Sequence, residues 1–187
     1  MYPEAKDSLE IVERKLGSIR PDAGFAHDAY VIATIEEAVQ AVKEGNFGVG
    51  AVIVDPEGKV VQRGHNRVFA PYFRSDLHAE MDAMTRFEER FQDLPSIAAY
   101  TLVTSLEPCP MCLTRLITSR IGKVFYAAED GDSGMVTRLQ SLSPVWVEMA
   151  SHQIFELAQC APALRDLARE VVLTTANRNT EKLLRRG

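Results

Sequence analysis

Two short segments of the chain carry side chains that can bind a metal ion. One contains His78, and the other contains Cys109 and Cys112, which lie three residues apart. Two cysteines with this spacing in the first turn of a helix can direct both sulfur atoms to one point. The unpaired N–H groups and the positive dipole end of a helix N-terminus stabilise the thiolate, the form of cysteine that binds zinc. With His78 as the third ligand, these residues predict a tetrahedral Zn2+ site with one open position, as in catalytic zinc sites.

Glu80 follows His78 by two residues and is predicted to be the catalytic residue. On a helix, a side chain two positions from His78 points in a different direction, which disfavours Glu80 as a fourth ligand. One neutral imidazole and two thiolates cancel the charge of Zn2+, so the metal acidifies water less than it would with three histidines. A nearby carboxylate that accepts a proton then becomes useful.

Cys-x-x-Cys alone is also typical of half a structural zinc site or of a redox pair. The chain contains no second Cys-x-x-Cys that would complete a four-cysteine site. The remaining cysteine, Cys160, lies among small apolar residues and is interpreted as a buried hydrophobic residue. His-x-Glu followed by Pro-Cys-x-x-Cys is more specific than either part, and the combination is the established motif of zinc deaminases.

The segments that must position these residues alternate between strand and helix. Apolar runs and turn residues predict strands at 49–54, 59–64, 99–104 and 123–128. The spacing of apolar residues and the helix start and stop signals predict helices at 28–44, 78–91, 110–119 and 162–175. In the stretch 130–161, a short helix and then an edge strand near 145–149 are expected. This order predicts a mixed sheet that is covered by helices on both faces.

The length of 187 residues predicts a single domain spanning 1–187, with an N-terminal extension over 1–25 and a C-terminal region over 135–187 that supplies packing and specificity. The chain carries 21 Lys and Arg against 26 Asp and Glu, a net charge of −5, which lacks the basic balance of a general nucleic-acid binder. It begins without the pattern of a signal peptide and has no apolar stretch long enough to cross a bilayer. A cytoplasmic protein without a membrane partner is therefore expected.

Between about residues 49 and 128 the chain resembles the cytidine deaminase superfamily, in particular its nucleobase deaminase and tRNA adenosine deaminase branch. The resemblance rests on five segments: Val49–Val54, Gly64–Arg67, His78–Glu80, Glu107–Cys112 and Ser119–Ala128. It implies a three-layer α/β/α sandwich with a five-stranded mixed sheet. It also implies assembly as a homodimer or a larger oligomer.

The resemblance also implies roles for individual residues. His78, Cys109 and Cys112 are implied to bind zinc, and Glu80 to shuttle protons while water replaces an exocyclic amine by a carbonyl and ammonia leaves. Asn66 is implied to hydrogen-bond the substrate, although a turn residue that ends a strand is the alternative interpretation.

Other polar features are expected to serve the structure rather than the chemistry. His65 is expected at a strand end facing solvent, and Glu107 is expected to anchor the loop before the first cysteine. The basic tail is expected to be a solvated terminus and consists of Lys182, Arg185 and Arg186.

The sequence contains conflicting indications of the substrate. Cys109–Leu113 and Phe125–Glu129 resemble guanine deaminases, whereas Ser119–Lys123 looks more like tRNA adenosine deaminases. Arg74–Leu77 departs from the Asp-Pro-Thr-Ala that both groups commonly show before His-Ala-Glu. The acidic residue that guanine deaminases use downstream has three candidates in this chain: Asp130, Asp132 and Glu148.

The charge balance favours a free nucleobase or nucleoside as the partner, and a purine such as guanine before a pyrimidine. Nucleic acid remains an alternative partner, for a tRNA adenosine-to-inosine deaminase. A cytosine or cytidine deaminase is a further alternative. From another class, a catalytically silent zinc-binding module of the same fold would be expected to lose the proton shuttle, and Glu80 is present.

Overall fold

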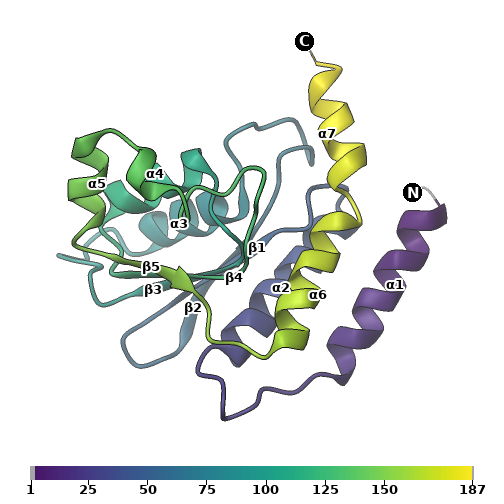
Figure 1. The fold of residues 1–187 in the computed structure, drawn as a ribbon, viewed down its shortest axis with the longest axis horizontal. Coiled ribbons are helices and arrows are strands. Elements are labelled where there is room, and N and C mark those ends of the chain that lie inside the picture. The colour runs from purple at the N-terminus through teal and green to yellow at the C-terminus, as the bar shows by residue number, and fades with distance from the viewer. Residues whose placement is uncertain (1–2, 187) are drawn as a thin grey trace.

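The computed structural model describes residues 3–186 (Figure 1). Its elements follow one another in this order: α1 (Pro3–Ser18), α2 (Asp28–Lys43), β1 (Gly50–Val54), β2 (Val60–His65), α3 (Ala79–Arg90), β3 (Thr101–Leu106), α4 (Pro110–Ser119), β4 (Lys123–Ala128), a 3-10 turn η1 (Leu139–Ser141), α5 (Pro144–Ala150), β5 (Ile154–Leu157), α6 (Pro162–Leu173) and α7 (Ala176–Leu184). Among these residues, no helix combines the length and the apolar composition that crossing a membrane requires.

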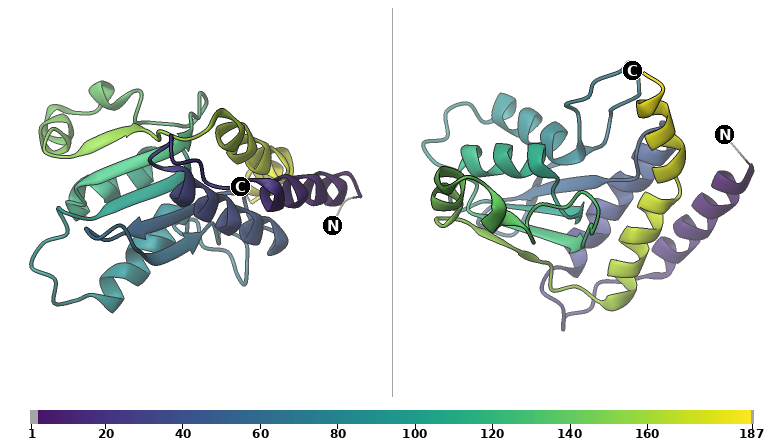
Figure 2. Two further views of the ribbon diagram at one scale, coloured as in Figure 1. Left: turned by 90° about the horizontal axis from the view of Figure 1, so that it is seen from below. Right: turned by 45° about the horizontal axis from the view of Figure 1, so that its top comes forward.

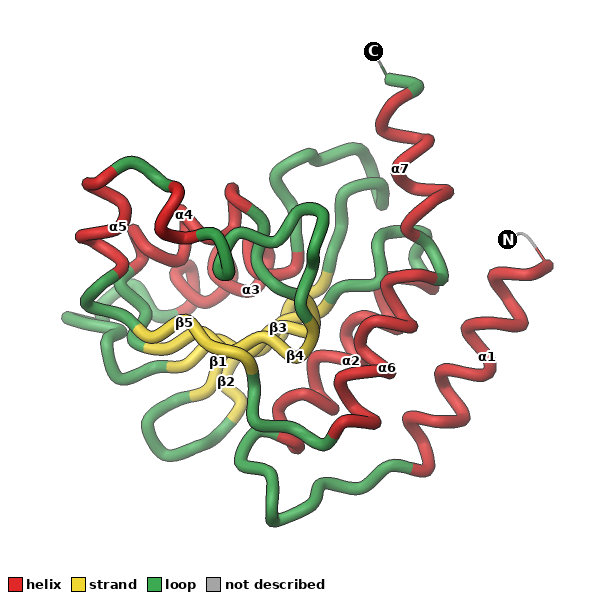
Figure 3. The backbone as a smooth tube through the Cα atoms, in the orientation of Figure 1, coloured by secondary structure: helices red, strands yellow, loops and turns green. Residues whose placement is uncertain are grey.

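The strands form one five-stranded sheet in the order β2-β1-β3-β4-β5 (Figure 3). β1 runs antiparallel to both β2 and β3, whereas β3, β4 and β5 run parallel to one another. Because parallel strands require a crossover, α4 connects β3 to β4 and the segment containing α5 connects β4 to β5. The predicted mixed sheet is confirmed.

Helices cover both faces of this sheet (Figure 1). Alternate side chains of β1 enter different cores, because successive residues of a strand face opposite sides. Val52 and Val54 pack with α2 and α6, whereas Ala51 and Ile53 pack with α3 and α4. The three-layer α/β/α sandwich that the resemblance implies is therefore confirmed.

Several predicted elements occur where their local signals placed them. α4 begins at Pro110, in the first turn where a missing N–H costs nothing, and β4 spans 123–128 as predicted. β3 begins at Thr101 rather than at residue 99 and continues to Leu106. Its two extra C-terminal residues carry the chain to the start of the loop before Cys109.

The predicted edge strand at 145–149 is wrong, because this segment belongs to α5. Pro144 stands in the first turn of the helix, and Trp146, Met149 and Ala150 have the spacing of one helical face. That face packs on α4 in a small core of its own. The edge strand is instead β5, which pairs in parallel with β4.

The N-terminal extension contains a helix that the sequence analysis did not predict. Leu9 and Val12 of α1 are buried in the core that contains α2 and α6. Lys15 also forms an ion pair with Glu170 of α6, with 2.7 Å between Nζ and Oε2. Part of the extension thus forms an outer layer on one face of the molecule, and Figure 2 shows α1 alongside α6.

Gly64 in β2 lies at close range to Ala83 of α3. A Cβ atom at position 64 would lie 2.5 Å from the backbone nitrogen of Ala83 and 2.9 Å from its Cβ. We expect Gly64→Ala to push the strand and the helix apart and to lower the free energy of unfolding by about 1–3 kcal/mol, the usual cost of overpacking. Chemical denaturation measures this change. Gly131→Ala is the control, because a Cβ there meets nothing within 4 Å, and equal stability of the two variants would contradict the close packing.

Candidate active site

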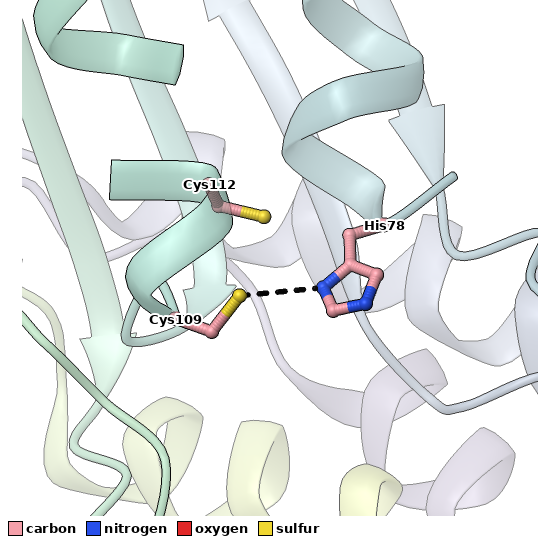
Figure 4. Close-up of side chains that lie close together, drawn as sticks. All are labelled: His78, Cys109 and Cys112. Atoms are coloured by element: carbon pink, nitrogen blue, oxygen red, sulfur yellow. Dashed lines mark hydrogen bonds between the residues drawn. The ribbon is translucent and has the colours of Figure 1, made fainter. Parts of the chain in front are cut away.

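The three predicted metal ligands meet where two helices begin. His78 is the N-cap of α3 and Cys109 is the N-cap of α4, both with extended backbone conformations. Cys112 lies one turn into α4 and is buried. The three side chains point toward one another in Figure 4. The structure thus brings together residues that are separated by a strand and a helix in the sequence.

The spacing of the donor atoms fits zinc. Sγ of Cys109 lies 3.5 Å from Nδ1 of His78, and one donor atom from each of His78, Cys109 and Cys112 lies within 4.8 Å of the others. Bond lengths of about 2.0 Å to nitrogen and about 2.3 Å to sulfur place two ligands of a tetrahedral zinc about 3.6 Å apart. Two sulfurs and one imidazole nitrogen are also the donors that zinc prefers.

The two cysteines differ in their affinity for protons. A hydrogen bond from the Cys112 thiol lowers the pKa of Cys109 to about 4. Burial opposes this shift in part, and His78 adds to it. The thiolate of Cys109 and burial raise the pKa of Cys112 well above its usual value. Burial lowers the pKa of His78, but the hydrogen bond with Cys109 and the charge of Glu80 outweigh it, so the net shift is upward. Cys109 therefore offers a thiolate, whereas Cys112 must release a proton when a metal binds.

Glu80 lies in the first turn of α3 with 4% of its surface exposed. Burial raises the pKa of its carboxyl group, and the negative charge of Cys109 raises it further. His78 and Cys112 oppose this increase only in part. A buried carboxyl group beside the three donors is therefore placed to exchange protons at the site.

Asn66 begins the loop that leaves β2 and is 3% exposed. Its backbone N–H donates to the carbonyl of Val49 at 2.9 Å, and its Oδ1 accepts a hydrogen bond from the N–H of Val68 at 3.2 Å. This Asx-type turn fixes the orientation of the amide, because only the oxygen can accept from Val68. The Nδ2 group is left as the donor that a ligand can use, which is compatible with the predicted substrate contact.

The loop between Asn66 and His78 is held by a residue whose role the sequence analysis missed. Asn46 lies in the loop that follows α2. Its buried Oδ1 accepts hydrogen bonds from the backbone N–H groups of Phe69 at 2.7 Å and Ala70 at 3.1 Å. An asparagine after a helix gives no signal of a partner so far along the chain.

The segment Arg74–Leu77, which departs from the pattern of the relatives, contains a local ion pair. Nε and Nη2 of Arg74 lie 2.8 and 2.7 Å from the two carboxylate oxygens of Asp76. The carbonyl of Asp76 accepts a hydrogen bond from the N–H of His78 at 3.0 Å. The unusual segment thus leads directly into the first turn of α3.

A second loop, over residues 129–138, is anchored by Glu107, which was expected to anchor the loop before Cys109 instead. The buried Glu107 carboxylate accepts hydrogen bonds from the N–H of Asp130 and from both the N–H and the hydroxyl of Thr137. A Cβ atom at Gly134 would overlap this carboxylate at 2.4 Å, so the loop can approach only with glycine there. Met135 also donates to the carbonyl of Pro108 at 2.9 Å, next to the first cysteine.

The three candidates for a downstream acidic residue differ in their surroundings. Asp130 uses its Oδ1 to accept from the N–H groups of Asp132 and Ser133 at 3.1 Å, so it stabilises its own turn. Asp132 is exposed, and Glu148 is an exposed residue of α5. Within residues 3–186, the metal-binding cluster includes none of the three.

The basic C-terminal segment is not the free terminus that was expected, because it forms α7 and packs on the loop after β2 (Figure 2, right). Nζ of Lys182 lies 5.1 Å from the ring centre of Phe69, and the guanidinium of Arg186 lies 3.7 Å from that of Phe73. Both distances are typical of cation–π contacts. The positive charges of Lys182 in α7 and of Arg186 just after this helix thus lie on the loop that connects Asn66 to the metal site.

Removal of either sulfur should remove the metal. We expect Cys109→Ala and Cys112→Ala to reduce bound zinc from about one ion per chain to well below half of that, because two ligands hold zinc far more weakly than three. Elemental analysis of the purified protein measures the metal. Cys160→Ala is the control, because Cys160 lies outside the cluster. Full zinc content in both site variants would contradict the assignment of the ligands.

Comparisons with known proteins agree with this geometry. Residues 26–128 match the family model of the cytidine and deoxycytidylate deaminase zinc-binding region. The chain is 34% identical over 117 residues to a tRNA-specific adenosine deaminase of Bacillus subtilis, which covers 62% of this chain and 70% of that protein. It is 35% identical over 109 residues to a tRNA(Ile)-lysidine synthase of Deinococcus radiodurans, which covers 56% of this chain but only 18% of that longer protein.

Solved structures show the same fold. One from a study of A-to-I editing by tRNA:A34 deaminases has a TM-score of 0.64 at 24% identity, over 76% of this chain and 98% of that chain. A guanine deaminase from Nitrosomonas europaea has a TM-score of 0.61 at 22% identity, over 87% of this chain and 92% of that chain. The zinc-compatible cluster and the family match together identify zinc as the cofactor. The chain belongs to the cytidine and deoxycytidylate deaminase zinc-binding family.

Proposed function

We propose that this protein is a hydrolytic deaminase that converts the exocyclic amine of a purine base to a carbonyl and releases ammonia, with a free base or nucleoside such as guanine as its substrate. The observation that carries the proposal is the buried carboxylate of Glu80 beside the donors of His78, Cys109 and Cys112. A structural zinc site needs four protein ligands and no proton carrier. Three ligands and an adjacent carboxyl group instead fit a reaction with water.

In the proposed reaction, His78, Cys109 and Cys112 would hold the zinc ion, which would supply Lewis-acid activation of water when bound. Glu80 removes a proton from the water as its oxygen adds to the carbon that carries the amine. The resulting carboxylic acid donates its proton to the ring nitrogen. The regenerated carboxylate then takes the proton of the added hydroxyl group and passes it to the departing amine, so that the C–N bond breaks, the carbonyl forms and ammonia leaves. Nδ2 of Asn66 holds the base by a hydrogen bond, since Oδ1 is already occupied by Val68.

Two features favour a small substrate. The net charge of −5 provides little general attraction for a phosphate backbone. The loop anchored by Glu107 carries acidic residues at 129, 130 and 132, and would repel phosphates if it lies at the pocket rim. A guanine deaminase is among the proteins with this fold.

A tRNA adenosine deaminase is the second candidate, and a specific observation favours it. Lys182 and Arg186 place positive charge on the loop after Asn66, where a phosphate of a bound RNA could contact it. The sequence identity to a tRNA-specific adenosine deaminase points the same way. Both candidates deaminate a purine, so they differ in what surrounds the base rather than in the chemistry.

The proposal extends to the domain organisation, the oligomeric state and the location of the protein. We take residues 1–187 to act as a single domain in the cytoplasm and as a homodimer, with residues 135–187 contributing to specificity. α7, which lies within that region, contacts the loop beside the candidate site. Sedimentation velocity measures the oligomeric state directly.

Glu80→Gln tests the proton shuttle. We expect the variant to keep its zinc and fold but to lose turnover by about three orders of magnitude or more, because an amide cannot carry the proton. Ammonia release and elemental analysis on the same sample separate these effects. Glu89→Gln, at an exposed position of the same helix, is the matched control. A near-normal rate in Glu80→Gln with zinc present would refute the proposed mechanism.

A substrate panel combined with charge reversal on α7 tests the choice of partner. Zinc-loaded protein is offered guanine, adenine, cytosine, their nucleosides and a tRNA anticodon stem-loop, and ammonia is measured. We expect release from guanine or another free purine or nucleoside, with a rate that Lys182→Glu/Arg186→Glu changes less than about twofold.

The control for this panel is Arg14→Glu/Lys59→Glu, which makes the same charge change on residues far along the chain from the metal ligands. Release from the stem-loop alone, with a loss of about tenfold or more on reversal of the α7 charges but not in the control, would replace the small-molecule proposal by RNA editing.

A further inference from the structure

His65, the last residue of β2, lies between the carboxylates of Glu37 in α2 and Glu44 at the C-cap of that helix. Its Nδ1 is 2.9 Å from Oε2 of Glu37, and its Nε2 is 3.1 Å from Oε2 of Glu44. Only 12% of the imidazole is exposed, so the ring does not face solvent as the sequence led us to expect. Sequence reasoning missed this arrangement because strand β1 and a turn separate β2 from the two glutamates.

The two contacts determine the number of protons on the ring. A carboxylate can only accept a hydrogen bond, so each ring nitrogen must carry a hydrogen for both contacts to form. A neutral imidazole has one N–H and would direct the lone pair of its other nitrogen at a carboxylate. His65 therefore joins β2 to α2 fully only as the imidazolium ion.

The other charged groups around His65 do not remove this requirement. Arg63, also on β2, lies 3.6 Å from Glu37 and shares that carboxylate. Asp82 of α3 accepts a hydrogen bond from the backbone N–H of His65 at 3.3 Å and lies 3.7 Å from Arg67. Burial lowers the pKa of His65, but the hydrogen bonds and charges of the two glutamates outweigh it, so the net shift is upward.

The same contacts surround Asn66. His65, the residue before it, contacts Glu37 of α2 through its imidazole and Asp82 of α3 through its backbone N–H. Arg67, the residue after it, forms an ion pair with Asp82. Among residues 3–186, the hydrogen bonds of Asn66 are that of its backbone N–H with Val49 and that of its side chain in the local turn. The direction of the Asn66 amide therefore depends on the anchoring of its two neighbours.

We propose that His65 is a positioning residue, whose doubly hydrogen-bonded imidazolium holds Asn66 in the geometry that binds the substrate. This inference rests on the substrate contact proposed for Asn66. When the ring loses its proton, one of the two contacts with Glu37 and Glu44 breaks, and the end of β2 is released from α2. Substrate binding then weakens, whereas proton transfer by Glu80 is unaffected.

The pH dependence follows from the direction of the shift. Because the pKa of His65 is raised in the folded chain, its stabilising contribution is fully present below the unperturbed value of about 6.5. That contribution is lost as pH rises through the raised value. We therefore expect KM to increase as the pH rises through the pKa of His65, whereas deprotonation of His65 should change kcat little.

NMR tests the inference without a substrate. Nitrogen-15 spectra of uniformly labelled, zinc-loaded protein are recorded against pH, with His65→Gln used to assign the ring signals. We expect both ring nitrogens to carry protons near neutral pH, and the side-chain amide signals of Asn66 to shift with the same midpoint. A neutral ring at pH 6, or Asn66 signals that do not follow the titration of His65, would overturn the inference.

Variants of Glu44 test the consequence for binding. We expect Glu44→Gln, which removes one of the two charges, to move the midpoint of His65 to lower pH. It should also raise KM for the purine that the panel identifies by about threefold or more, at nearly constant kcat. Glu57→Gln, in the exposed turn between β1 and β2, is the matched control. Equal losses of kcat and stability without a shift in the midpoint would show a merely structural role.

These measurements keep the two proposals apart. If no member of the panel releases ammonia, the proposed function fails, but the NMR titration still decides whether His65 controls the position of Asn66. If ammonia is released and Asn66 is indifferent to the protonation of His65, the function stands and this inference is refuted.

Discussion

The convergence of two helix N-termini beyond the C-terminal ends of β2 and β3 is the constraint on which the site depends. His78 and Cys109 are the N-caps of α3 and α4, and this position places their side chains 3.5 Å apart without strain in either helix. The exposed N–H groups at both termini favour negative charge, which suits a site with two sulfur ligands. Because α3 begins at the histidine, its first turn also places Glu80 beside the donors. One packing arrangement thus provides both the metal ligands and the proton carrier.

Two loops flank this centre, and each is held by a buried side chain that accepts hydrogen bonds from backbone N–H groups. Asn46 holds the loop after β2, and Glu107 holds the loop after β4. Hydrogen bonds from backbone N–H groups to a carboxylate are stronger than neutral ones, and breaking them would leave a buried charge unpaired. The loops that flank the three donor residues are therefore held by buried side chains of other segments. Such support is what a site needs to hold a small ligand in one orientation.

The charged residues near Asn66 connect the end of β2 and the loop after it to neighbouring helices. His65 connects β2 to two carboxylates, one in α2 and one at its C-cap, and Asp82 of α3 contacts both neighbours of Asn66. On the other side, Lys182 of α7 lies over the ring of Phe69. The segment proposed to bind the base is thus linked to α2, α3 and α7. The contacts that position the metal donors and Glu80 differ from those that position Asn66, so a substitution can alter one set without altering the other.

Local signals in the sequence were sufficient for the chemistry and for most of the sheet. The spacing of Cys109 and Cys112, the proline between them and the His-x-Glu pair predicted the ligands, the helix start and the proton carrier, because each signal lies within one turn of chain. Contacts between distant segments were not predictable in this way. The roles of His65, Asn46 and Lys182 each depend on a partner in another element, and the residues at 145–149 read as a strand until their packing on α4 is known. The sequence by itself therefore determined the metal site and the reaction class, whereas only the tertiary structure decided what holds the loops around it, because residue types do not reveal which distant groups they will meet.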